Sequence, residues 1–258
     1  MTLRSRNRVI DLFFFLIVTT IVYLAYELLR TGPIAAEVNP RAFLFVLIRS
    51  LIPLFLGFMG LLGFYRYFRK VTGVLIFFFF LSLFSLVFDA AGLFSLLLGA
   101  RDLSFDGVIV LSRANLFGLI LGTLAIAAAS MYVAGLSYQN QGTALSIILI
   151  LSYLMAQEVP LATSLPSIGG LFAPIPKIQL GILWGTAAVL ILLNFLRSAY
   201  GNRSKDEILL GLSVLSYLGG RVLLNGAESI ATLILGSVLL ILGATYYSRK
   251  VFEFYLWY

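Results

Sequence analysis

Long apolar stretches alternate with short polar segments along the chain, and most of them have the length of a membrane span. A helix needs about 20 apolar residues to cross the roughly 30 Å of hydrocarbon in a bilayer. The stretches lie at residues 9–29, 42–64, 71–98, 115–138, 143–159, 178–196, 207–224 and 228–247. This pattern predicts an all-α fold, a polytopic transmembrane helix bundle of about eight spans, with residues 1–258 as a single integral membrane domain.

Two segments leave this topology open. The last two stretches are joined by a short turn with Arg221 and Glu228 near its tip, so a re-entrant hairpin is an alternative to two full spans. The segment 160–177 holds four prolines, yet most of its side chains are apolar. A loop this apolar should fold back into the bundle mouth or rest at the membrane surface rather than lie in water.

The distribution of basic residues predicts which ends of the spans face the cytoplasm. Cytoplasmic loops carry an excess of Lys and Arg. With the N-terminus inside, the inner segments hold eleven such residues, namely Arg4, Arg6, Arg8, Arg66, Arg69, Lys70, Arg197, Arg203, Lys205, Arg249 and Lys250. The outer segments hold six, namely Arg30, Arg41, Arg101, Arg113, Lys177 and Arg221. We therefore expect a multi-pass protein of the cytoplasmic (inner) membrane with both termini cytoplasmic, and a first stretch that is a retained span rather than a cleaved signal.

Composition agrees with the pattern and removes several chemistries. The chain is 61% hydrophobic and 11% charged, with a mean hydropathy of +1.04, far from the roughly 25% charged residues of soluble domains. It has no Cys and no His, which excludes disulfides, thiolate nucleophiles, histidine-ligated haem and Ser-His dyads. We expect no cofactor, no metal site and no catalytic residue. The formal charge of +7 fits the bias of cytoplasmic loops, and no basic run with interleaved aromatics indicates nucleic-acid binding.

Charged residues inside the apolar stretches are the candidate functional positions, because an ion in hydrocarbon must face protein, water or another ion. Asp89 lies about 15 Å and Arg49 about 12 Å from the outer ends of their helices, from the rise per residue. Glu158, Arg221 and Glu228 also fall in the outer half. With Asn225 beside the turn, these are the six pocket candidates.

Two interpretations of this charged layer compete. In the first, the ions only pair with one another, Arg49 with Asp89 and Arg221 with Glu228, and so fix the register of the helices. In the second, the layer lines an outward-facing polar pocket that binds an ion, a solute or a lipid headgroup.

Small and large side chains add expectations about packing. Gly118 and Gly122, and likewise Gly181 and Gly185, have the four-residue spacing that allows close approach of membrane helices. The span 115–138 is rich in small residues and should be central. The four phenylalanines at 77–80 point in all directions around their helix, so part of that helix should touch lipid.

Three functions remain open. The first is an integral membrane transport protein, or the membrane subunit of a transporter, moving an unidentified small molecule or ion. The second is a non-catalytic membrane subunit, an anchor or a sensor of a larger complex, which would make other membrane subunits its partners beside the lipid bilayer. The third is an intramembrane enzyme acting on a lipid-linked substrate, with Asp89 or Glu158 as acid or base.

Overall fold

The computed structural model describes residues 3–38, 40–67, 73–99, 105–135, 141–159, 177–202, 205–227 and 229–256. These residues form helices almost throughout, which confirms the all-α prediction. In chain order the elements are α1 (Leu3–Val38), α2 (Pro40–Tyr67), α3 (Val74–Ser85), the 3₁₀ helix η1 (Leu86–Ala90), α4 (Ala91–Gly99), α5 (Phe105–Val133), α6 (Gln141–Glu158), α7 (Lys177–Asn202), α8 (Lys205–Asn225) and α9 (Ile230–Leu256).

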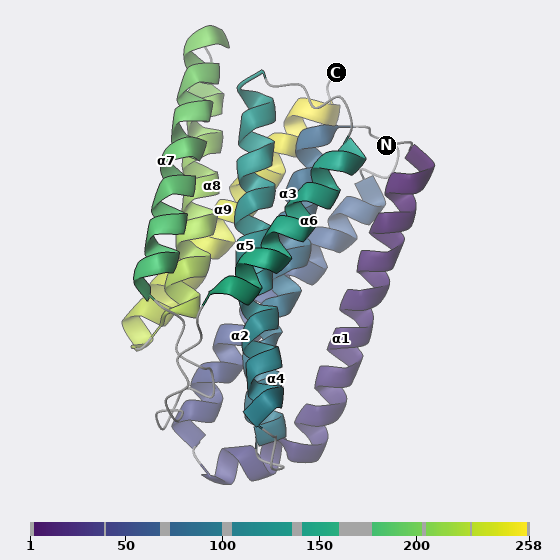
Figure 1. The fold of residues 1–258 in the computed structure, drawn as a ribbon, viewed down its shortest axis with the longest axis vertical. Helices are drawn as coiled ribbons and strands as arrows, with labels where there is room; N and C mark the ends of the chain where they lie inside the picture. Colours follow the sequence, from purple (N-terminus) through teal and green to yellow (C-terminus); the bar gives the residue numbers. More distant parts are fainter. Residues whose placement is uncertain are drawn as a thin grey trace.

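The helices form a bundle of the kind that crosses a membrane (Figure 1). Among the described residues, seven helical segments are long and apolar enough for a span, counting α3, η1 and α4 as one continuous segment. The remaining helix, α6, corresponds to the expected span 143–159 and has 18 residues. Helix α1 begins and α9 ends at the same end of the bundle (Figure 1), as the predicted topology requires.

The predicted start of the fourth span, at residue 115, was wrong. The sequence pattern places residues 99–114 in a loop, whereas α5 already begins at Phe105. Asp106 and Arg113 therefore lie on the helix. The reason is that the loop assignment rested on charge alone, and these charges occupy the end of a helix that extends beyond its apolar part. The segment 160–176, which the sequence predicts to be an apolar loop, lies outside the described residues.

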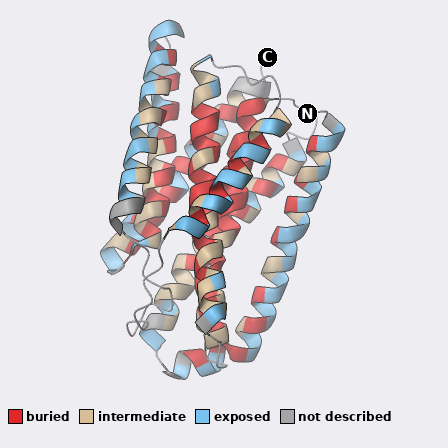
Figure 2. Cartoon of the chain, in the orientation of Figure 1, coloured by how far each residue is buried: buried red, intermediate tan, exposed pale blue. Residues whose placement is uncertain are grey.

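The continuous segment from α3 through η1 to α4 is the most deeply buried part of the bundle (Figure 2). It is enclosed by α1, α2 and α5. The four phenylalanines at 77–80 are at most 4% exposed, so the expectation that part of this helix touches lipid was wrong. Aromatic partners surround them: Phe80 contacts Phe13 and Phe64, and Phe79 contacts Tyr247.

Helix α5 is central, as its small residues predict, since it packs against α3, η1, α4, α6 and α7. Gly118 faces the backbone carbonyl of Ser85 and the side chain of Phe88, which confirms close packing at this position. The same expectation was wrong for Gly181 and Gly185 of α7 within the part of the chain that the structure describes, because a Cβ added at either would meet none of its atoms within 4 Å. A four-residue spacing of glycines permits close approach, but a neighbouring helix must be present to use it.

Helices α8 and α9 form a tightly packed antiparallel hairpin. Gly220 of α8 lies against the backbone of Gly236 and Leu240, and Gly243 of α9 lies against Tyr217. Both helices are long and apolar enough for full spans. The length of the two helices favours two full spans over a re-entrant hairpin. Their close packing also fixes the depth in the bundle at which the polar residues of α8 lie.

Candidate functional site

The interior of the bundle holds an ion pair between Asp89 of η1 and Arg221 of α8. Arg221 Nη2 donates to Asp89 Oδ1 at 2.8 Å, and Arg221 Nε donates to Asp89 Oδ2 at 3.0 Å. Both side chains are 2% exposed. The two parallel hydrogen bonds offset part of the free-energy cost of removing both ions from water. Either ion buried alone in an apolar interior would carry that cost without compensation.

Ser85 completes the coordination of the guanidinium. Arg221 Nη1 donates to Ser85 Oγ at 2.7 Å, and Arg221 Nη2 donates to the Ser85 carbonyl at 2.8 Å. The hydroxyl of Ser85 in turn donates to the carbonyl of Ser82 at 2.6 Å, one turn earlier. Arg221 is therefore held by a carboxylate, a hydroxyl and a main-chain carbonyl at once.

The helix changes type at this level. A serine that bonds back into the preceding turn disturbs the regular ladder of a helix, and the Ser85 hydroxyl makes such a bond to Ser82. The backbone continues as the five-residue 3₁₀ helix η1, with the Ala91 N–H donating to the Phe88 carbonyl. Asp89 thus lies within a 3₁₀ stretch near the middle of the continuous segment Val74–Gly99, and short stretches of this kind often mark a hinge.

Glycine 122 of α5 makes room for the guanidinium. A Cβ placed on Gly122 would overlap Nη1 of Arg221 and Oγ of Ser85. The four-residue spacing from Gly118 therefore serves two purposes: one glycine lets α5 approach η1, and the other leaves space for the polar contact between α8 and α3.

A second arginine lies beside this pair. Arg49 of α2 donates from Nη2 to Asn225 Oδ1 at 3.4 Å, and Asn225 Nδ2 donates to the Arg221 carbonyl at 3.3 Å. The charges of Arg49 and Asp89 also interact. We call Asp89, Arg221, Ser85, Arg49 and Asn225 the polar cluster. It joins α2, α3, η1 and α8, with α5 leaving the space.

Four of the six predicted pocket residues, Asp89, Arg49, Arg221 and Asn225, therefore lie together. The predicted pairing of Arg49 with Asp89 was wrong, because Asp89 bonds to Arg221. The predicted pairing of Arg221 with Glu228 stays a prediction. The depth of a residue along its own helix does not show which helices are neighbours in the bundle. In the structure, α8 places Arg221 at the carboxylate of Asp89. Glu158 is exposed at the end of α6 and does not join the cluster. Glu228 lies outside the described residues.

Ser82, Ser85 and Tyr217 were not among the predicted site residues. Tyr217, one turn before Arg221 on α8, donates from Oη to the Ser82 carbonyl at 3.1 Å, and both side chains are fully buried. A signal for the serines existed in the sequence, since Ser82, Ser85 and Asp89 recur at intervals of three and four and so share one helix face. Nothing in the sequence links that face to Tyr217.

The chemistry available in the cluster is ionic and hydrogen-bonding. Among the residues that the structure describes, no group of three or more Asp, Glu, His or Cys side chains could hold a metal ion. Comparison with protein-family models and with curated proteins gives no match.

Proposed function

We propose that this chain is a membrane transport protein, or the membrane subunit of a transporter, and that the polar cluster is its solute site. The observation that carries the proposal is the position of the Asp89–Arg221 pair at a 3₁₀ stretch in the middle of a span. Transporters repeatedly build solute and ion sites where a membrane helix is irregular, because main-chain polar groups then lie beside the charged side chains. The Ser85 carbonyl lies beside the pair in this way.

The cluster offers both kinds of charge to a ligand. A solute carboxylate or phosphate could take the place of Asp89 on Arg221 while a cationic group takes the place of Arg221 on Asp89. Only when both exchanges occur together do both buried ions stay paired, as a low-dielectric interior demands. Both side chains are 2% exposed, so in this proposal the buried pair is the closed form of the site, and movement of η1 would open it.

The basic residues support a location in the cytoplasmic membrane and an orientation of the bundle in it. The excess of basic residues at the end of the bundle that carries both termini supports a cytoplasmic membrane protein with that end inside. The polar cluster would then open toward the outside, and the segments that join consecutive helices at the inner end are short in sequence, at 68–73, 134–140 and 203–204. This favours a carrier driven by ion or solute gradients over one driven by a cytoplasmic motor.

A second function is a non-catalytic membrane subunit, anchor or sensor. The contacts of Arg221 favour it, since the guanidinium already bonds to Asp89 and to both oxygens of Ser85. A buried ion pair that is fully hydrogen-bonded can serve only to fix the register of helices.

Reconstituted vesicles distinguish the two functions. Charge movement on a solid-supported membrane would be recorded on addition of sodium chloride, potassium phosphate or a mixture of the common amino acids. The double variant Asp89→Asn with Arg221→Gln keeps a neutral hydrogen-bonded pair, so a structural role tolerates it and a solute site does not. Asp106→Asn, at an exposed position of α5, is the matched control.

We expect the wild type and the control to move at least one of these solutes above the level of empty vesicles, and the folded double variant to move none. Wild-type currents in the double variant would place the solute site elsewhere. Wild-type protein that moves none of the probes would instead leave the anchor or sensor function as the better account.

A further inference from the structure

Two arginines from different helices act on the carboxylate of Asp89. Arg221 of α8 bonds to it at 2.8 and 3.0 Å, and the charge of Arg49 on α2 interacts with it as well. Arg49 donates to Asn225 of α8 at 3.4 Å, which is longer than the usual N–H···O distance of about 2.7–3.2 Å. An arginine gains more from a carboxylate than from an amide oxygen, because both partners are then charged.

Arg49 and Asp89 lie on elements that pack against each other, whereas Arg221 comes from a different part of the bundle. Helix α2 packs directly against η1. Helix α8 packs mainly against α9 and α7, and it reaches Asp89 through the long side chain of Arg221. A shift of the α8–α9 hairpin relative to η1 would therefore take Arg221 away and leave α2 beside Asp89.

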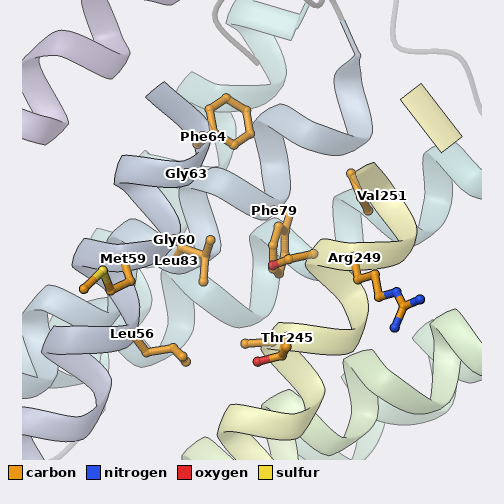
Figure 3. Close-up of a pocket in the computed structure, with 12 residues that line it drawn as sticks. Leu56, Met59, Gly60, Gly63, Phe64, Phe79, Leu83, Thr245, Arg249 and Val251 are labelled. Atoms are coloured by element: carbon orange, nitrogen blue, oxygen red, sulfur yellow. The ribbon is translucent and has the colours of Figure 1, made fainter. Parts of the chain in front are cut away.

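A cavity between α2 and α9 gives the hairpin room for such a shift (Figure 3). Its volume is about 360 Å³, with Met59 and Gly63 of α2 on one side and Thr245 of α9 on the other. A second cavity of about 710 Å³ lies between α1, α2 and Ile241 of α9. Protein interiors hold few voids larger than a water molecule, so the two cavities mark a loosely packed contact between α2 and the hairpin.

The same shift would break two bonds of the polar cluster at once, since both cross to α8. One is the bond from Arg221 to Asp89, and the other is the bond from Arg49 to Asn225. Asp89 would lose its guanidinium at the step at which α8 no longer holds Arg49. A carboxylate left alone in the interior is costly, and the nearest cation on the adjoining helix is then Arg49.

Building on the proposed transport function, we propose that Arg49 takes over the carboxylate of Asp89 when the site opens, and that an anionic group of the solute binds Arg221 in its place. That group is a carboxylate or a phosphate, which the guanidinium can hold through two parallel hydrogen bonds. The exchange requires a cation for Asp89, and Arg49 supplies it from the protein. The solute therefore needs no positive charge, and Arg49 is a positioning residue that acts on the solute through Asp89.

The test measures how tightly the purified full-length chain binds simple anions. Protein in detergent is titrated with sodium acetate or sodium phosphate at constant ionic strength, and the saturable rise in the midpoint of thermal unfolding gives the affinity. Arg49→Gln removes the charge and retains a donor for Asn225, whereas Arg49→Lys retains the charge. Arg8→Gln, exposed on α1, is the matched control.

We expect saturable binding of both anions to the wild type and unchanged binding to Arg8→Gln. Arg49→Gln should weaken both anions by about 100-fold or more, because Asp89 would be left without a cation. Arg49→Lys should stay within about tenfold of the wild type. Wild-type affinity in Arg49→Gln would overturn the proposal.

A second comparison separates the exchange from direct binding of the solute by Arg49. In Asp89→Asn no carboxylate has to be handed over, so adding Arg49→Gln should weaken acetate by less than about tenfold. If Asp89→Asn does not fold, glycine replaces this comparison, because its ammonium group can pair with Asp89 in Arg49→Gln. Equal losses in the two backgrounds, or for acetate and glycine, would make Arg49 a direct ligand and overturn the exchange.

Vesicles and binding together distinguish a failure of the exchange from a failure of transport. A wild type that moves amino acids but binds neither acetate nor phosphate would overturn the exchange and leave the transport function standing. Anion binding with the expected pattern in a chain that moves no solute would support the exchange and overturn transport. A chain that neither binds the anions nor moves a solute would overturn both.

Discussion

Arg221 and Asp89 are 132 positions apart in the chain, yet the guanidinium of one donates two hydrogen bonds to the carboxylate of the other at 2.8 and 3.0 Å. Their contact links the α8–α9 hairpin to the most buried segment of the bundle. Removing one partner of a buried ion pair leaves the other charge uncompensated, whereas removing both charges does not. This asymmetry gives the first prediction.

Asp89→Asn or Arg221→Gln alone should lower the free energy of unfolding by about 3–5 kcal/mol, because each leaves a lone ion in the interior. The double variant should recover most of that loss. Thermal unfolding in detergent, followed by size-exclusion chromatography, measures the three effects against Asp106→Asn. A double variant as unstable as the sum of the singles would show that the two residues are not coupled.

Gly122→Ala should destabilise the protein, since the new methyl group would overlap the Arg221 guanidinium and the Ser85 hydroxyl. Overpacking of this kind costs about 1–3 kcal/mol. Gly181→Ala is the matched change in open space and should leave the midpoint of thermal unfolding unchanged or raise it slightly, because alanine favours helix. Equal midpoints for the two variants would contradict the close approach of α5 to the polar cluster.

Arg113→Ala should loosen the end of α6. Arg113 of α5 donates from Nη1 to the carbonyls of Ala156 and Gln157, and to that of Val159 at 2.9 Å. Hydrogen bonds from a charged donor contribute about 1.5–3 kcal/mol each, so amides near residues 155–159 should exchange at least tenfold faster in hydrogen–deuterium exchange. Arg8→Ala should leave them unchanged. Unaltered exchange in Arg113→Ala would mean that the carbonyls are held by other groups.

The proposed orientation can be tested without background labelling, because the chain has no cysteine. Gly201→Cys and Gly226→Cys introduce thiols at exposed positions near opposite ends of α8. In intact cells, a membrane-impermeant maleimide should label Gly226→Cys at once and Gly201→Cys only after permeabilisation. The reverse result would invert the topology.

Apolar periods and breaker residues were sufficient to predict an all-α bundle and the approximate position of its long helices, because each span must be long and apolar enough to cross hydrocarbon by itself. They predicted eight spans, whereas seven segments of the described residues are long and apolar enough. They were less successful at helix ends. Helix α5 begins before its apolar part, and α9 continues past its basic residues to Leu256, since a helix needs no lipid contact to continue.

The sequence by itself determined that Asp89 and Arg221 require partners, because an isolated ion is too costly inside a membrane. Which partners they find was decided only by the tertiary structure. The packing of α8 beside η1, the space left by Gly122 and the 3₁₀ stretch after Ser85 bring Arg221 rather than Arg49 to the carboxylate. Burial of the phenylalanines at 77–80 was decided in the same way, because hydrophobicity fits lipid and protein interior equally well and only neighbouring helices distinguish them.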